Sequence, residues 1–169
     1  MDSAIDLKAL LVEREDCDAG TVQKLREGLA QGGNQFRVLR EVNEALRKKL
    51  ESAPPVLAKK LHLKLGIANF FLGHIAASVE HLKQVEAPLG YFYLGRALVN
   101  RQSFDEALKA FDKAEKAGYA APQVHLQRAG IHRQKGEIPQ AKAILTKLEE
   151  QSGFSSEFHF QSSGVSLAE

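Results

Sequence analysis

The sequence predicts an all-α fold in which antiparallel helix-turn-helix pairs stack beside one another as an α-solenoid. Apolar residues recur at steps of three and four through most of the chain, and this spacing places them on one face of a helix. A pattern of large and small residues recurs after 34 residues, from Gly95 to Ala129 for example, and such a period is typical of stacked helical repeats. At this period the 169 residues accommodate about nine or ten helices.

Residues 88–121 hold the clearest helix pair. The first helix places large and small apolar residues on one face: Tyr91, Leu94, Gly95 and Leu98. Ser103 precedes the second helix and has a glutamate three residues later, so we expect a capping box there. The second helix carries its own apolar stripe: Phe104, Ala107, Leu108, Phe111 and Ala114. We expect the small Gly95 and Ala107 to let the two backbones approach, and Gly118 to end the pair in a left-handed conformation.

The same register continues into residues 122–155. Adding 34 to four core positions of the first pair, Gly95, Ala107, Phe111 and Ala114, leads to Ala129, Ala141, Leu145 and Leu148. A single helix pair cannot bury both of its apolar faces, so these pairs require stacked neighbours.

These positions resemble those of the tetratricopeptide repeat family, whose period is 34 residues. The family pattern of aromatic, L-G, A, F and A positions is matched by Tyr91, Leu94, Gly95, Ala107, Phe111 and Ala114. Two departures stand out: Gln102 occupies a turn position where glycine is common, and His125 and His132 replace aromatic residues in the following repeat. The resemblance implies that the helix pairs form a right-handed superhelix.

Residues 1–52 are expected to form a degenerate, TPR-like helical region. The first helix is amphipathic, with Leu7, Leu10 and Leu11 turned inward. A second helix is expected from Thr21 to Gln31 and a third from about Gln35 to Glu51. The third helix has the inward stripe Phe36, Leu39, Val42, Leu46 and Leu50.

Residues 54–169 are expected to continue as one solenoid. Pro54 and Pro55 end the preceding helix and begin the next, because proline is tolerated only in a first helical turn. The repeats are expected at about 59–87, 88–121 and 122–155, followed by residues 156–169 as a capping helix or a partial repeat. Of these two alternatives we favour the partial repeat, which makes the chain the N-terminal part of a longer repeat protein.

Composition and charge exclude several classes of function. The net charge of +2 comes from interspersed acids and bases, so we expect no broad basic field and no direct nucleic-acid binding. No apolar run reaches the about 18 residues needed to span a bilayer, and the acidic start of the chain favours the cytoplasm. Cys17 is the only cysteine, so we expect no internal disulfide and interpret it as an unreactive residue between helices.

Catalytic and cofactor motifs are absent from the sequence, so we expect neither an enzyme nor a cofactor. His62, His125 and His159 share the aromatic position of the repeat and are expected as partly buried rings between helices. The pairs His74/His81 and His125/His132 lie two turns apart, but zinc sites favour closer spacing or cysteine partners. We therefore predict no metal site.

The family resemblance also implies where a partner would bind, because related repeats use a concave surface lined by the first helix of each pair. The corresponding positions here are Leu63, Ile67, Phe70, Phe71, Phe92, Arg96, Val99, Asn100, Gln123, Leu126, Arg133 and Gln134. For Leu63, Phe70 and Leu126 the alternative is that they are core residues between repeats. The predicted partner-binding set is Phe71, Phe92, Arg96, Asn100, Arg133 and Gln134. Only Arg96 matches the cationic clamp of chaperone-binding relatives, which argues against that adaptor role.

Two functions remain open at this point. The first is a scaffold that binds a protein or peptide with apolar anchors and one acidic group. The second is a self-assembly unit that forms homo-oligomers through its terminal helices, for which exposed Phe158 and Phe160 would provide apolar surface.

Overall fold

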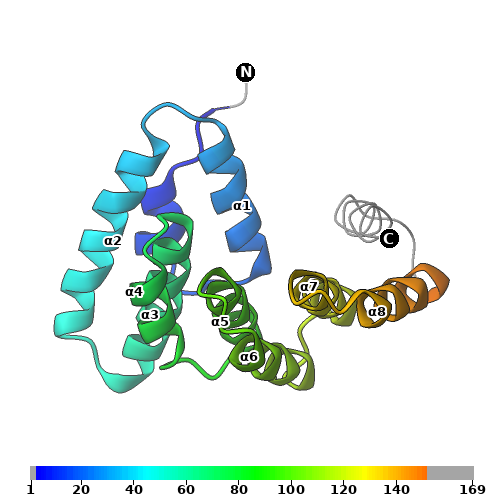
Figure 1. Ribbon diagram of the computed structural model, residues 1–169. Helices are drawn as coiled ribbons and strands as arrows, with labels where there is room; N and C mark the ends of the chain where they lie inside the picture. The colour runs from blue at the N-terminus through cyan, green and yellow to red at the C-terminus, as the bar shows by residue number, and fades with distance from the viewer. Residues whose placement is uncertain (1–2, 152–169) are drawn as a thin grey trace.

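The computed structural model describes residues 3–151, and over that range the chain is entirely helical, without strands (Figure 1). The elements in order are a short π-helix η1 (Ala9–Glu13), α1 (Ala19–Ala30), α2 (Gln35–Glu51), α3 (Pro55–Phe71), α4 (Ile75–Leu82), α5 (Pro88–Asn100), α6 (Phe104–Lys116), α7 (Ala121–Gln134) and α8 (Ile138–Gln151). The all-α prediction is confirmed. The expected helix at 156–169, with His159, Phe158 and Phe160, lies outside the described residues.

Three antiparallel helix pairs follow one another along the chain: α3/α4, α5/α6 and α7/α8 (Figure 1). The second helix of each pair also packs on the first helix of the next, α4 on α5 and α6 on α7. The N-terminal helices lie at the α3/α4 end, where α2 packs along α3. Packing between consecutive helices gives an all-α, solenoid-like arrangement. Within residues 3–151, no helix combines the length and the apolar character that a membrane span requires.

Proline and left-handed residues set the limits of the helix pairs. Each first helix has proline in its first turn, where the missing N–H group costs no hydrogen bond. The turn inside each pair contains one residue with positive φ: Gly73 (80°), Gln102 (60°) and Gly136 (79°). Gln102 therefore adopts the conformation of the glycine that it replaces, and among the described residues it is the only non-glycine with positive φ.

The capping box predicted at Ser103 is wrong. Ser103 does precede α6, but its side chain makes no cap hydrogen bond, because its backbone (φ −85°, ψ 66°) is outside the extended region that aims an N-cap oxygen at the free N–H groups. The capping box lies instead at the start of α1. There the Asp18 Oδ1 accepts a hydrogen bond from the Thr21 N–H at 2.8 Å, and the Thr21 Oγ1 accepts one from the Asp18 N–H at 3.3 Å.

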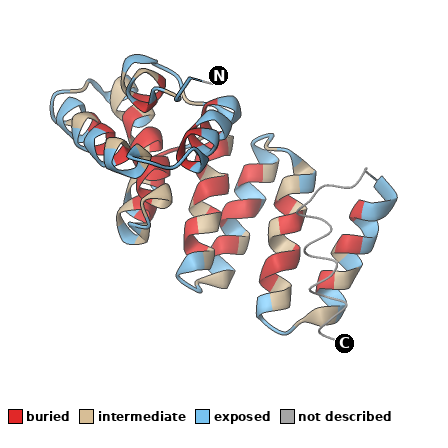
Figure 2. Cartoon of the chain, turned by 90° about the horizontal axis from the view of Figure 1, so that it is seen from above, coloured by how far each residue is buried: buried red, intermediate tan, exposed pale blue. Residues whose placement is uncertain are grey.

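Buried residues follow the facing sides of the helices (Figure 2). One apolar core extends from the N-terminal region to α7, and it includes Leu7, Leu10 and Leu11 as predicted. Phe36 was wrongly assigned to the inward stripe, since its side chain is 46% exposed. The neighbouring Gln35 side chain donates a hydrogen bond to the Ile5 carbonyl at 3.3 Å.

Small residues bring the paired backbones together as expected. A Cβ atom on Gly95 would lie 2.6 Å from Phe111 Cε1, and one on Gly66 would lie 2.4 Å from Leu82 Cγ. Both distances are too short for carbon atoms, so these glycines are required for α5 to pack on α6 and α3 on α4. The pair α7/α8 has a separate apolar cluster: Leu126, Ala129, Ala141, Leu145 and Leu148.

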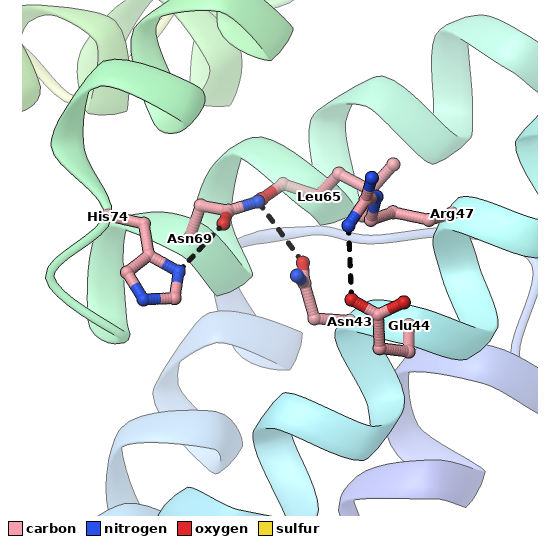
Figure 3. Close-up of polar contacts among 6 residues, drawn as sticks. All are labelled: Asn43, Glu44, Arg47, Leu65, Asn69 and His74. Carbon is pink, nitrogen blue, oxygen red and sulfur yellow. Dashed lines mark hydrogen bonds and ion pairs between the residues drawn. The ribbon is translucent and has the colours of Figure 1, made fainter.

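A buried amide pair joins the N-terminal region to the first helix pair (Figure 3). The Asn69 side chain on α3 donates to the Asn43 Oδ1 on α2 at 3.1 Å and to the Leu65 carbonyl at 2.8 Å. The Asn69 Oδ1 lies 3.3 Å from the His74 Nδ1 in the following turn. Asn69 is only 3% exposed, so these contacts satisfy a polar group that would otherwise destabilise the fold.

Candidate functional site

The main cleft of the described residues lies between α1 and the first helices of the second and third pairs. Its volume is about 730 Å³, within the usual range of about 300–1,000 Å³ for ligand pockets. Helix α1 forms one wall with Val22, Gln23, Arg26 and Glu27. The opposite wall comes from α5 and from the α6–α7 connection with the start of α7.

Aromatic rings form the apolar part of this opposite wall. The Phe92 ring of α5 stacks on the Tyr119 ring, with centroids 4.1 Å apart and planes at 12°. It also meets Phe111 and Tyr93 edge-on, each at 5.6 Å. Phe92 is 5% exposed, so it belongs to the core and presents only a small part of its surface to the cleft. The stack joins Phe92 of α5 to Tyr119 of the α6–α7 connection, so both elements contribute to the apolar surface of the cleft.

Two arginines bring positive charge to the cleft from opposite walls, Arg26 from α1 and Arg96 from α5. The Arg96 guanidinium lies over the Phe70 ring at 5.1 Å and the Tyr93 ring at 5.4 Å, which orients it without neutralising it. Neither arginine forms an ion pair with a carboxylate of residues 3–151.

Tyr93 lies close to both charges. Burial raises the pKa of the Tyr93 hydroxyl, while Arg96 and Arg26 act in the opposite direction. The remaining polar groups of the cleft include the amides of Gln23, Gln123 and Gln127, together with the carboxylate of Glu27. The cleft therefore combines an aromatic surface, two guanidinium groups and several neutral hydrogen-bonding groups.

The structure brings only part of the predicted partner-binding set to this cleft. Phe92 and Arg96 line it. Phe71 packs edge-on against Phe70 at 5.4 Å and is not among the lining residues. The Asn100 side chain donates a hydrogen bond to the Arg96 carbonyl of its own helix at 3.1 Å.

Arg133 and Gln134 occupy the last turn of α7 and do not line the cleft either. Among the other surface positions, Gln123 does line it. Leu63 and Leu126 are buried, in agreement with the alternative that they are core residues.

Sequence reasoning missed the contribution of α1. The partner-binding positions were transferred from the repeat pattern, and α1 precedes the first clear repeat, so Arg26 had no equivalent position. The available signal was an arginine four residues after Val22 on an otherwise amphipathic helix, but local periodicity does not show which distant helix it faces.

The histidines are held by neighbouring helices. The Nδ1 atoms of His62 on α3 and His81 on α4 lie 3.0 Å apart, and burial lowers the pKa of both rings. On α7, the His125 Nε2 lies 3.3 Å from the Glu115 Oε1 and the His132 Nδ1 lies 2.6 Å from the Glu137 Oε2. The prediction of partly buried rings between helices is confirmed for His62 and His125. Within residues 3–151, no three or more His, Cys, Asp or Glu side chains gather as a metal centre.

Cys17 lies beside the buried Lys64 at the N-terminal end of the molecule. Burial raises the pKa of the Cys17 thiol to about 11, so the thiol is protonated at neutral pH and is a poor nucleophile. The Lys64 ammonium donates a hydrogen bond to the Arg14 carbonyl, and the Lys49 ammonium donates one to the Val12 carbonyl at 2.9 Å. Lys49 thus attaches η1 to α2, and Lys64 attaches the residue after η1 to α3.

A scan against protein-family models and a search of curated proteins found no match to this chain.

Proposed function

We propose that this chain is a non-catalytic scaffold, related to the tetratricopeptide repeat proteins, that binds a protein partner in the cleft between α1 and the α5–α7 surface. The observation that carries the proposal is the pair of guanidinium groups, Arg26 and Arg96, which line the cleft without a carboxylate partner among residues 3–151. The 34-residue register and the solenoid-like packing support the family assignment.

The chemistry of the cleft indicates the kind of segment that fits. A carboxylate placed between Arg26 and Arg96 would gain charge-assisted hydrogen bonds from both walls. An apolar side chain next to it would cover the Phe92 and Tyr119 edge, since aromatic residues are frequent anchors at interfaces. The glutamine amides can bond to the backbone of an extended peptide. We therefore infer an extended, acidic peptide segment with at least one apolar anchor.

The cell compartment and the assembly state belong to the same proposal. The presence of only one cysteine in the sequence favours a reducing compartment, and we propose the cytoplasm. The competing function is self-assembly through the terminal helices. A mass measurement over a range of protein concentrations separates the two, because the scaffold is expected to bind its peptide as a monomer.

The experiment is a selection of random peptides displayed on phage, followed by fluorescence anisotropy with the enriched sequences. We expect these peptides to share an Asp or Glu next to an apolar residue, and to bind more weakly as salt concentration rises. Arg26→Glu and Arg96→Glu should each weaken binding by about tenfold or more, as for charge pairs at other interfaces. Circular dichroism of each variant checks that the helices remain.

The matched control is Lys109→Glu on α6, which makes the same change of charge at an exposed site outside the cleft. This variant should bind the selected peptides as the unchanged protein does. Enrichment of basic peptides, or equal loss of affinity in Lys109→Glu and Arg96→Glu, would overturn the cleft as the binding site.

A further inference from the structure

The imidazoles of His62 and His81 face each other across the first helix pair. Their Nδ1 atoms lie 3.0 Å apart, their ring centroids are 5.2 Å apart and their planes meet at 40°. Both rings are half-buried, so the pair is open to water on one side. It lies outside the cleft of the proposed function.

The packing of α3 on α4 holds this pair in place. His62 is one helical turn before Gly66, the residue whose missing side chain lets the backbone of α3 approach Leu82 of α4. His81 directly precedes Leu82. The Ser78 hydroxyl, one turn earlier on α4, donates a hydrogen bond to the Gly66 carbonyl at 2.7 Å. Two independent contacts between the helices therefore fix the separation of the two imidazoles.

We propose that His62 and His81 form a two-histidine binding site for a divalent transition-metal ion of the Cu(II) or Ni(II) class, with water in the remaining coordination positions. Imidazole nitrogen is a preferred ligand of these ions. In the metal-free protein one Nδ1 donates its proton to the other; a metal ion would release that proton to solvent and bind both nitrogens from a point beside the line that joins them.

The distance between the nitrogens is compatible with two ligands of one metal ion. With metal–nitrogen bonds of about 2.0–2.1 Å, two nitrogens lie about 2.9 Å apart at a right angle and about 3.3–3.4 Å apart at the tetrahedral angle. The observed 3.0 Å is the length of the hydrogen bond between the metal-free rings, and it already places both nitrogens within the span that one ion requires. The ion class follows from the ligands instead, because imidazole suits copper and nickel, and Cu(II) has the highest affinity among divalent first-row ions for a given nitrogen site.

Charged groups of both signs act on the pKa of His81. Glu80 and Arg47 act on His81 in opposite directions, and the Arg47 guanidinium is held by Glu44 at 3.1 Å. The next histidine along the chain, His74, interacts with Asn69 instead. The protein therefore contributes two ligands, so the expected affinity is lower than that of a closed four-ligand site.

A metal ion at this site would link α3 to α4. Because such an ion binds the folded chain and not the separated helices, it should raise the melting temperature as its concentration increases. The experiment titrates the full chain, without a histidine tag, with CuCl2, NiCl2 or ZnCl2, and measures affinity by calorimetry and melting by circular dichroism. We expect a melting temperature that rises with Cu(II) and Ni(II), and a smaller rise with Zn(II).

His62→Gln and His81→Gln should each reduce Cu(II) affinity by about tenfold or more, because the loss of an outer-shell partner alone costs about 10–100-fold. The matched controls His74→Gln, His125→Gln and His132→Gln should leave the affinity unchanged. Electron paramagnetic resonance of the Cu(II)-loaded, unsubstituted protein should show coupling to two nitrogens, and this readout does not depend on the folding of a variant. Binding that survives His62→Gln, or a spectrum without nitrogen coupling, would overturn the site.

Discussion

The pairs α5/α6 and α7/α8 occupy equivalent positions of the repeat, but their interiors differ. In α5/α6 the fully buried Phe111 ring packs directly on Gly95. In α7/α8 the equivalent residues are Leu145 and Ala129. Leucine thus replaces the phenylalanine and alanine replaces the glycine, so the interior of this pair contains no aromatic ring at that position. The α7/α8 cluster is also separate from the main core, to which α7 contributes Val124 and Ile131 from its other side.

The contacts that join each of these two pairs to the pair before it also differ, in their polarity. The connection from α4 to α5 packs on α5 through apolar groups, since a Cβ atom on Gly90 would lie 2.8 Å from Cγ1 of Val85 in that connection. The α6/α7 contact includes charged groups: Arg128 forms ion pairs with Asp112 and with Glu115, the latter at 2.6 Å. Partly exposed ion pairs contribute less than buried apolar surface. One backbone arrangement thus supports pairs of unequal stability, and α7/α8 should open first.

The largest expected effect on the free energy of unfolding comes from truncating one large core side chain in each pair. Phe111→Ala should lower the free energy of unfolding by about 3–5 kcal/mol, and Leu145→Ala by about 2–3 kcal/mol, because the aromatic ring leaves the larger cavity. Urea unfolding followed by circular dichroism measures both losses. Equal losses at the two positions would show that the pairs do not differ in core strength.

A smaller effect is expected from the close approach of the helices. Gly95→Ala should destabilise the protein by about 1–3 kcal/mol, because the added methyl group overlaps the Phe111 ring. The reciprocal change in the next pair, Ala129→Gly, should cost about 1 kcal/mol through helix propensity and about 0.8 kcal/mol through the loss of a buried methyl group. Thermal melts of the two variants make the comparison. A Gly95→Ala variant as stable as the unchanged protein would contradict tight packing at α5/α6.

The turn inside each pair provides a stabilising test. Gln102 has φ of 60° where the next pair has Gly136 at 79°. A left-handed conformation costs a non-glycine residue about 1–2 kcal/mol, of which the flexibility of glycine in the unfolded chain offsets about half. Gln102→Gly should therefore stabilise the protein by about 0.5–1 kcal/mol and Gly136→Gln should destabilise it, both measured by urea unfolding. Destabilisation by Gln102→Gly would mean that the glutamine side chain supports the turn.

The smallest effect concerns the α6/α7 ion pairs. The hydrogen bond from Arg128 is the largest cause that lowers the pKa of Glu115 below its usual 4.5. A carboxylate with a lowered pKa in the folded state stabilises that state above about pH 4.5, and the contribution is lost as the pH falls through the folded pKa. Hydrogen exchange of α7 and α8 amides should accelerate on acidification before that of α5 and α6 amides.

Glu115→Gln is the control for this pH dependence. It removes the titrating carboxylate, so the difference between the two pairs should change less with pH than in the unchanged protein. If α5 and α6 amides lose protection first, the charged contact is not the weaker one.

The helix limits were largely predictable from sequence, because they depend on local signals. Prolines mark the starts of α3 and α5. Helix α2, which is the third helix predicted from the sequence, begins at Gln35 and ends at Glu51 as predicted. Ser103 shows the limit of such signals: its sequence fits a capping box, but the left-handed Gln102 before it changes the course of the backbone.

The cleft was less predictable, because it depends on contacts between distant parts of the chain. Arg96 could be named from the repeat register, whereas Arg26 reaches the same cleft only because α1 lies opposite α5. Phe36 illustrates the same difficulty, since its position on the apolar side of a helix did not show that no neighbour would cover it.

The buried amide of Asn69 has a consequence for the order of the helices. In a stack of similar apolar surfaces, many helices could dock on α3 with comparable gain. Only a helix that carries an amide or similar group opposite Asn69, as α2 does with Asn43, satisfies the polar atoms at that level. The Asn43–Asn69 hydrogen bond thus makes the packing specific: it favours α2 as the neighbour of α3 and disfavours any helix that lacks an amide at that level.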